Sequence, residues 1–138
     1  MNVLVDTSVW SLALRRGARD LSAAEQSAVA ELAQLIREGR ARILGLIRQE
    51  LLSGIKAPAQ FEKLRAALRA FPDEPIGTAD HEAAAKASNA CRSRGVVVSL
   101  VDILICSVAA TRGWPIFTTD TDFARYARLL PVNLHAPR

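Results

Sequence analysis

The feature that most constrains the fold is a short apolar run near the start of the chain that stops at an acidic residue. Val3, Leu4 and Val5 form this run, and two of the three are β-branched. An unbroken run, unlike an alternating one, is typical of a strand that is buried on both faces of a parallel sheet. In open α/β sheets, ligands bind beyond the carboxyl ends of the strands. Asp6, which ends the run, is therefore expected at the mouth of a site.

Asp6 also has a plainer interpretation, in which it only terminates the strand or caps a helix. Thr7 and Ser8 follow it, and their hydroxyls could cap a helix that starts near Val9. Both interpretations of Asp6 are open on this stretch alone.

Short apolar runs alternate with amphipathic helical segments along the rest of the chain. Strands are predicted at residues 3–5, 41–45, 115–118 and 132–134, with one or two residues more at Ile76. Helices are predicted at residues 9–16, 23–38, 47–53, 58–71, 79–94, 100–112 and 123–129, several of them ended by a glycine. Ser22 and Ser99 begin capping-box patterns, Thr78 is a further predicted cap, and the three valines before Ser99 are not expected to form a strand. The alternation predicts α/β architecture: a single domain over residues 1–138, with a short, mostly parallel sheet flanked by helices.

Composition narrows the class of protein. A chain of 138 residues, half of them apolar and 23% charged, is the size and type of one globular domain. No apolar run approaches a membrane span, and Asp6 interrupts anything like a signal peptide. Cys91 and Cys106 lack metal-type spacing and are expected to be reduced, packed residues of a cytoplasmic protein. The formal charge of +4 favours polyanionic partners.

Five acidic residues occupy positions that a parallel sheet could bring together. Asp6 and Asp120 follow apolar runs, Glu50 and Asp102 lie on helices that follow a strand or loop, and Asp122 comes two residues after Asp120. Converging carboxylates raise one another's pKa unless a cation lies among them. Hard oxygen ligands suit Mg²⁺ or Mn²⁺. Such an ion can activate a water and stabilise the charge on a phosphodiester under attack.

Each acid taken singly has a simpler explanation. Asp102 is the fourth residue of a capping box, Asp120 is a turn residue, and Glu50 is an exposed helix position. The overall charge favours the joint explanation, because setting aside the five acids leaves 9 of the 14 acidic residues against 18 basic ones. A basic surface around an acidic notch suits a nuclease, which attracts phosphates broadly and cuts them locally.

Four motifs follow one another at the spacing of a known family. They are Val5-Asp6-Thr7-Ser8-Val9, Glu50-Leu51-Leu52-Ser53-Gly54, the segment from Gly95 through Asp102 to Ile105, and Thr118-Thr119-Asp120-Thr121-Asp122-Phe123. In this order they resemble the PIN-domain ribonucleases, and among these the VapC-like toxins of bacterial type II toxin–antitoxin pairs. The resemblance spans essentially the whole chain. Cys106 and Ser107 stand where the family often has two alanines.

The resemblance implies a function and a set of site residues. Asp6, Glu50, Asp102 and Asp120 are implied to be metal-binding catalytic acids, with Asp122 as an auxiliary ligand and Thr7, Ser8 and Thr118 supporting them. The implied activity is that of a Mg²⁺-dependent endoribonuclease toxin, with Mn²⁺ as the alternative ion. The implied partners are an RNA substrate, a cognate antitoxin and a second copy in a homodimer, with no membrane. The competing hypothesis is a catalytically silent PIN-like module that binds RNA or a partner without cutting.

Other site classes find less support in the residues. A Ser-His-Asp site is not expected, because His81 and His135 have no suggestive neighbours, and no glycine pattern resembles a P-loop. A receiver-like phosphoacceptor domain would need a lysine after a late strand, and none is present. The RNA-binding candidates are Arg15, Arg16, Arg19, Lys63, Arg65 and Arg69, which a solvated surface would explain equally well. The predicted docking face for a partner helix comprises Val9, Trp10, Leu12, Leu14 and Leu32.

Overall fold

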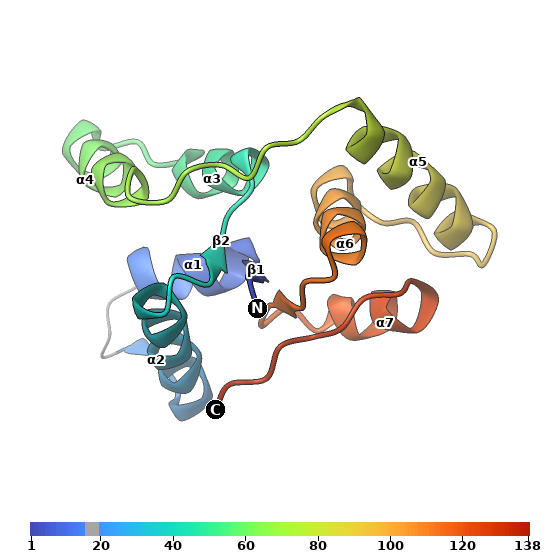
Figure 1. Ribbon diagram of the computed structural model, residues 1–138. Helices are drawn as coiled ribbons and strands as arrows, with labels where there is room; N and C mark the ends of the chain where they lie inside the picture. Colours follow the sequence, from blue (N-terminus) through green and yellow to red (C-terminus); the bar gives the residue numbers. More distant parts are fainter. Residues whose placement is uncertain (16–19) are drawn as a thin grey trace.

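Three short parallel strands form a sheet at the centre of the molecule, in the order β2-β1-β3 (Figure 1). The computed structural model describes residues 1–15 and 20–138. The strands are β1 (Val3–Val5), β2 (Ala41–Arg42) and β3 (Ile116–Phe117). Leu4 pairs with Arg42 on one side and with Ile116 on the other. Because β1 is parallel to both neighbours, the residues after β1 and after β3 emerge at the same edge of the sheet.

Helices connect the strands and cover the sheet. The described residues contain α1 (Thr7–Leu14), α2 (Ala23–Arg37), α3 (Gly45–Leu52), α4 (Pro58–Leu68), α5 (Thr78–Arg92), α6 (Leu100–Arg112) and α7 (Asp122–Leu129). The first two helices lead from β1 to β2, and the next four lead from β2 to β3. In Figure 1, α5 lies beside α6, and α2 and α7 lie on opposite sides of the molecule. The predicted α/β architecture with a parallel sheet is confirmed.

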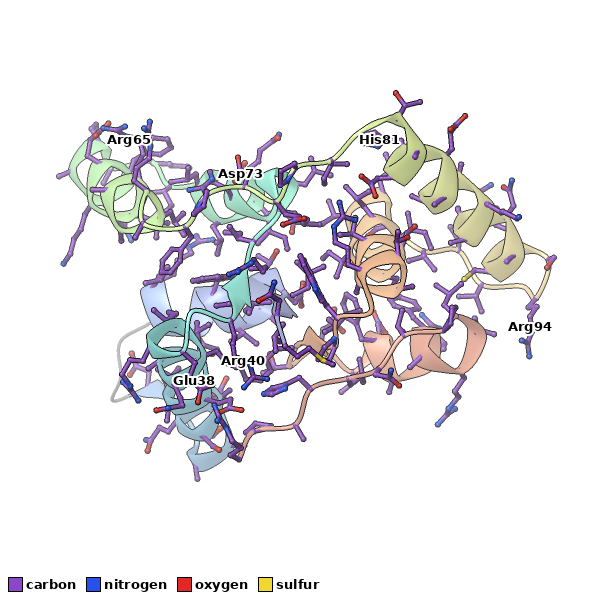
Figure 2. The ribbon with its side chains drawn as sticks, in the orientation of Figure 1. Glu38, Arg40, Arg65, Asp73, His81 and Arg94 are labelled. Atoms are coloured by element: carbon purple, nitrogen blue, oxygen red, sulfur yellow. The ribbon has the colours of Figure 1, made fainter. Side chains whose placement is uncertain are left out.

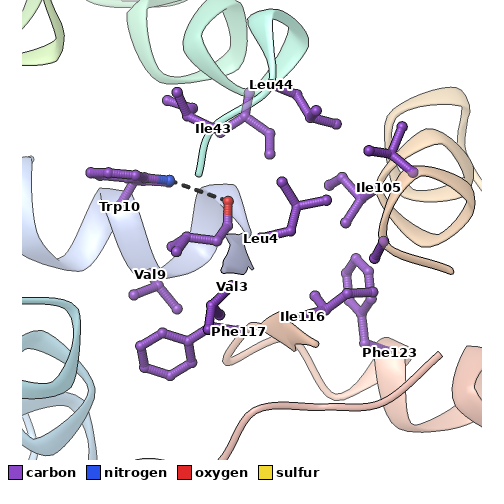
Figure 3. Packing of buried hydrophobic residues seen from close by; sticks show 14 of the residues in the cluster. Val3, Leu4, Val9, Trp10, Ile43, Leu44, Ile105, Ile116, Phe117 and Phe123 are labelled. Carbon is purple, nitrogen blue, oxygen red and sulfur yellow. Dashed lines mark hydrogen bonds between the residues drawn. The ribbon is translucent and has the colours of Figure 1, made fainter. Parts of the chain in front are cut away.

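The core surrounds β1 on both faces (Figure 3). All three residues of β1 are fully buried, as an unbroken apolar run predicts. Trp10 is fully buried beside them, and its indole Nε1 donates a 3.2 Å hydrogen bond to the carbonyl oxygen of Val5. Its ring also contacts Phe71, with 4.9 Å between the centroids. Burying such a side chain stabilises the fold by about 2–3 kcal/mol.

The predicted docking face on the first two helices is wrong. Val9, Trp10, Leu12 and Leu32 are all core residues, at most 5% exposed, and only Leu14 reaches the surface at 37%. The physical reason is that α1 packs against both α2 and α3, so its apolar side chains are already covered by this chain.

Several helix starts differ from the expectation by one or two residues. The predicted capping box at Ser22 is confirmed, because both reciprocal hydrogen bonds between Ser22 and Glu25 are present. Helix α1 begins at Thr7, so Asp6 holds the N-cap position that was expected for the two hydroxyl residues. Thr78 is not a cap, because it is already helical and the Asp80 carboxylate accepts the backbone N–H of Gly77 at 3.0 Å.

Three of the predicted strand segments are shorter in the structure or absent from it. Ile76 is not in a strand, and residues 132–134 contribute a single bridge between Leu134 and Ile116. Ile43 likewise makes only one bridge, to Asp73, beyond the end of β2. Ile43 and Ile76 each lie two residues before a helix, so a longer ladder cannot extend there.

A charged cluster ties the carboxyl terminus to α2. Glu31, which is 5% exposed, contacts His135 at 2.6 Å and Arg138 at 3.1 Å. Arg138 also pairs with Glu38 at 2.8 Å, and Figure 2 shows Glu38 beside Arg40. The backbone N–H of His135 donates to the carbonyl of Ile116, so this terminal segment supports β3 from outside.

The remaining composition-based expectations concern cysteines, histidines and membranes. Cys91 and Cys106 are free thiols and both are buried, as expected. His81 lies at the start of α5 (Figure 2), and His135 lies in the charged cluster on α2. None of the helices in residues 1–15 and 20–138 is long and apolar enough to cross a membrane.

Candidate functional site

Asp6 lies at the carboxyl end of the central strand and is 5% exposed. Its backbone N–H donates to the carbonyl of Phe117, which places it against the end of β3. Its Oδ2 accepts two hydrogen bonds, from Ser8 Oγ at 2.8 Å and from Thr118 Oγ1 at 2.7 Å. Although Asp6 holds the N-cap position of α1, its side chain accepts no capping hydrogen bond from the helix. The Asp6 carboxylate is therefore bonded to the Ser8 and Thr118 hydroxyls and not to backbone N–H groups of the helix.

The two hydroxyl groups also join the first turn of α1 to the loop that follows β3. Ser8 Oγ accepts the backbone N–H of Thr119 at 3.0 Å, and Thr118 Oγ1 accepts that of Asp120 at 3.0 Å. Each hydroxyl thus donates to Asp6 and accepts from the loop that carries Asp120. This network fixes the position of one acid relative to the loop of another.

Asp120 begins the turn that leads into α7. Its Oδ1 accepts the backbone N–H of Asp122 at 2.9 Å, as the turn interpretation predicts. Its second oxygen has no hydrogen-bond partner among the described residues. Asp120 is exposed, so a ligand can reach its side chain from solvent.

Asp102 lies in the first turn of α6. Its backbone N–H donates to Ser99 Oγ at 3.1 Å, but the reciprocal bond from the Ser99 N–H to the Asp102 carboxylate is not made. In the complete box on α2, by contrast, Glu25 Oε1 accepts the N–H of Ser22 at 2.9 Å. The capping-box prediction at Ser99 is therefore only half realised, and the Asp102 carboxylate is left for the site.

The electrostatics of Asp102 show which groups surround it. Burial raises the pKa of Asp102 to about 6, and the negative charges of other carboxylates add to the rise. The contributing carboxylates are, in decreasing order, Asp6, Asp120, Glu50 and Asp122. The other four predicted acids therefore lie within electrostatic range of Asp102.

Glu50 reaches this edge from the second half of α3. Its side chain is exposed, and its Oε1 accepts a 2.6 Å hydrogen bond from Thr7 Oγ1. Thr7 directly follows Asp6, so the bond draws Glu50 toward the end of β1. Glu50 is therefore more than an exposed helix position.

Few of the described basic residues lie close enough to form ion pairs with these acids. Within the described part of the chain, no Lys, Arg or His forms an ion pair with Asp6, Glu50, Asp102 or Asp120. Asp122 alone has such a contact, at 3.8 Å to Arg125. We call these five residues the acid cluster.

The comparison with known families agrees with this geometry. The family model of the PIN domain matches residues 3–129 of the chain. The chain belongs to the PIN-domain family. No curated protein matches its sequence closely enough to count as a relative.

Solved structures share the fold of this PIN domain over nearly its whole length. FitAcB from Neisseria gonorrhoeae is 21% identical with a TM-score of 0.75, and the match covers 98% of this chain and 97% of the other. VapBC2 from Rickettsia felis, solved with a DNA fragment from its promoter, is 17% identical with a TM-score of 0.72, covering 98% of each chain. VapBC-5 from Mycobacterium tuberculosis is 20% identical with a TM-score of 0.68, covering 97% and 98%.

The acid cluster of this PIN domain fits a divalent cation in charge and donor type. Carboxylate oxygens are the donors that Mg²⁺ and Mn²⁺ prefer, and a cation would offset the repulsion that raises the pKa of Asp102. The side chains are not yet gathered around one point: among the described residues, no three His, Cys, Asp or Glu side chains form a ready metal-binding group. Glu50 and Asp120 have oxygens turned to Thr7 and to the Asp122 backbone, and these are the side chains that would have to rotate.

Sequence reasoning missed two residues of α7 that contact the acid cluster. Tyr126 is 3% exposed, and its hydroxyl lies 3.5 Å from Asp102 Oδ2. The guanidinium of Arg125 lies over the Tyr126 ring, 5.7 Å from its centroid. The available signal was the helical spacing from Asp122, which places both residues about one turn further along the same helix.

The basic residues proposed for RNA binding have mixed surroundings. Arg15, Lys63 and Arg69 are exposed, whereas Arg65 pairs with Glu62 at 2.7 Å. Arg16 and Arg19 lie outside the described residues.

Proposed function

We propose that this PIN domain is a divalent-metal-dependent endoribonuclease that acts through the acid cluster. The observation that carries the proposal is that carboxylates surround the partly buried Asp102, while among the described residues no Lys, Arg or His pairs with Asp6, Glu50, Asp102 or Asp120. Clustering acids without a counterion costs free energy, so an arrangement of this kind favours a cation-binding role.

The residues of the acid cluster have distinct proposed roles. Asp6 and Asp102, the least exposed of the cluster, would hold Mg²⁺ or Mn²⁺, together with Glu50 and Asp120 once their side chains turn inward. Asp122 is the auxiliary ligand. A divalent cation bound there supplies an activated water and neutralises charge on the phosphodiester.

The hydroxyl residues prepare the site for this chemistry. Ser8 and Thr118 hold Asp6 Oδ2 by two hydrogen bonds, which leaves Oδ1 for a ligand. Thr7 keeps Glu50 close to Asp6. Positioning by fixed hydrogen bonds reduces the reorganisation that a reaction would otherwise require.

The charge of the whole protein supports RNA as the substrate class. The chain has 18 basic residues against 14 acidic ones, and five of the acids are in the acid cluster. Most of the remaining surface can therefore attract phosphates. We place the reaction in the cytoplasm, where RNA is available.

The solved structures that share the fold suggest a biological role. VapBC-5 is described as a member of a toxin–antitoxin family. We propose that this PIN domain is likewise a toxin that a cognate antitoxin neutralises. The uncompensated charge of Asp6 and Asp102 would attract a basic side chain of the partner, which would compete with the metal. Co-expression with the neighbouring upstream gene should remove toxicity and yield a stable complex. A chain that neither slows growth nor binds that partner would contradict the toxin role and leave the nuclease proposal standing.

We also propose a homodimer. Leu100 is 85% exposed and lines a groove together with Leu46, Ile103 and residues of α5, and Val97, three residues earlier in the sequence, is 72% exposed. A second copy that covers these side chains would bury apolar surface that water otherwise contacts. Sedimentation of the wild type should show a dimer, and Leu100→Glu should shift it to a monomer. A wild-type monomer at high concentration would contradict the homodimer.

The nuclease proposal is tested by incubating purified protein with a structured RNA in Mg²⁺, in Mn²⁺ and in excess EDTA. Asp6→Asn keeps the shape of the side chain but removes its charge, and Asp20→Asn makes the same change at an exposed aspartate elsewhere. Cleavage should require the metal, should be lost in Asp6→Asn and should persist in Asp20→Asn. Cleavage that persists in excess chelator would refute the mechanism.

One observation favours the alternative of a silent binding module. The acid side chains are not gathered into a ready metal-binding group among the described residues. A silent module would bind RNA or a partner in the same assay without producing new RNA ends, and Asp6→Asn would leave that binding intact.

A further inference from the structure

Arg125 is a solvent-accessible positive charge that the fold holds at the border of the acid cluster. It belongs to α7, the helix that begins at Asp122. Its guanidinium lies over the ring of Tyr126 at 5.7 Å, and the Tyr126 hydroxyl lies 3.5 Å from the carboxylate of Asp102. The Tyr126 ring therefore separates the Arg125 guanidinium from the Asp102 carboxylate of the proposed active site.

Tyr126 is a buried ring between these two groups. The ring is only 3% exposed and packs edge-on against Phe123, with 5.3 Å between the centroids. The Tyr126 ring is thus packed between Phe123 and the Arg125 guanidinium.

Arg125 remains available because its intramolecular contacts are weak. Its distance to Asp122 is 3.8 Å, and both side chains are more than half exposed, at 54% and 57%. Exposed pairs of this kind contribute about 0–1 kcal/mol. Arg112, by contrast, is bound to Glu74, to Asp80 and to the Pro75 carbonyl, and its side chain is 19% exposed. Arg112 is committed to the fold, whereas the Arg125 side chain is 54% exposed and can reach an external anion.

We propose that Arg125 binds a backbone phosphate of the RNA next to the scissile bond. This inference rests on the proposed function and names a substrate-binding residue for it. RNA carries a negative charge on every phosphate, so a cation beside the acid cluster can help to hold the strand in place. A guanidinium suits this role because its planar fork can donate two parallel hydrogen bonds to phosphate oxygens. Among residues 1–15 and 20–138, the weak bond to Asp122 is the one ion pair that Arg125 would give up.

The test measures RNA binding separately from cleavage. The full-length protein carrying Asp6→Asn is titrated into a fluorescein-labelled single-stranded RNA of mixed sequence, in Mg²⁺ and at several salt concentrations. Arg125→Gln is then added to this background. Arg37→Gln is the matched control, because Arg37 is an exposed arginine on α2, on the opposite side of the molecule (Figure 1), and the two variants lose the same charge.

Arg125→Gln should weaken binding about tenfold, the scale of one charge-assisted contact. It should also reduce the slope of log Kd against log salt by about 0.7, the value for one phosphate on a single strand. Arg37→Gln should change binding less than twofold and leave the slope unaltered. Arg125→Lys should recover part of the affinity, and circular dichroism should show that all variants are folded.

Equal effects of Arg125→Gln and Arg37→Gln, or an unchanged salt slope, would overturn the inference. The outcomes for this inference and for the proposed function are separable. If the wild type cleaves RNA and Arg125→Gln binds it normally, only the inference is wrong. If the wild type does not cleave but Arg125→Gln loses RNA affinity and slope, the nuclease proposal fails and Arg125 still binds RNA.

Discussion

Replacing Asp102 by asparagine should stabilise the metal-free protein while abolishing its activity. Asp102 has an ordinary pKa of 3.8 and a pKa of about 6 in the folded protein, so folding disfavours its ionised form. That difference corresponds to about 3 kcal/mol at neutral pH. Because the side chain is partly exposed, solvent screening reduces the expected effect to about 1–2 kcal/mol. For a chain of this size, this is a rise in Tm of roughly 3–8 °C.

The pH dependence of the stability gained in Asp102→Asn follows from the direction in which folding shifts the pKa of Asp102. Below about pH 4 the carboxyl group is protonated in the folded and unfolded states, and Asp102→Asn should match the wild type. As the pH rises from about 4 to 6, the unfolded chain releases the proton first, and the wild type loses stability relative to the variant. Above about pH 6 the gain of the variant should be constant.

The assay is thermal unfolding followed by circular dichroism in EDTA, from pH 3.5 to pH 8. Asp20→Asn is the control, because Asp20 is exposed and lies outside the acid cluster. Excess Mg²⁺ should raise the Tm of the wild type more than that of Asp102→Asn, since binding to the folded state stabilises it. An Asp102→Asn variant that is less stable than the wild type at pH 7.5 in EDTA would refute the reasoning.

The remaining predictions concern the other groups that hold the site and the fold. Asp6→Asn should lower RNA cleavage by about 10²-fold or more in a gel assay with the fold intact, and near-normal cleavage would remove Asp6 from the mechanism. Thr118→Val should lower cleavage and cost about 1–3 kcal/mol in urea unfolding, because it removes a donor to Asp6 and an acceptor for a backbone N–H, whereas Thr118→Ser should retain both. Burial alone would raise the pKa of Glu31, but hydrogen bonds from His135 and Arg138 outweigh it and lower the pKa. Glu31→Gln should therefore cost roughly 2–4 kcal/mol at pH 7 and less as the pH falls below the ordinary value of 4.5, and a pH-independent cost would contradict this account.

The sequence was most informative where a side chain's position follows from the end of a strand. Asp6 and Asp120 could be placed because each follows an unbroken apolar run, and parallel strands end at the same edge of a sheet. The helix ends at Gly39 and Gly113 were also predictable, because both glycines adopt a positive φ, of 69° and 70°, that other residues avoid.

The sequence was less informative where position depends on contacts between distant segments. Helical spacing from Asp122 could indicate Tyr126, but its contact with Asp102 also depends on the packing of α7 near the start of α6. The burial of Trp10 depends on covering helices, so its apolar neighbours suggested a partner surface that the fold does not leave open. The half-formed capping box at Ser99 shows the same limit, because a local motif predicted a hydrogen bond that the Asp102 side chain does not make.

The central claim, that the acid cluster is a catalytic divalent-metal site, is tested most directly by anomalous diffraction from crystals of the wild type soaked in Mn²⁺. We expect an anomalous peak in contact with the carboxylates of Asp6 and Asp102, with Glu50 or Asp120 turned toward it from the positions that Thr7 and the Asp122 backbone now hold. A fully soaked crystal with no anomalous density at the acid cluster, from a protein that cleaves RNA, would contradict the account.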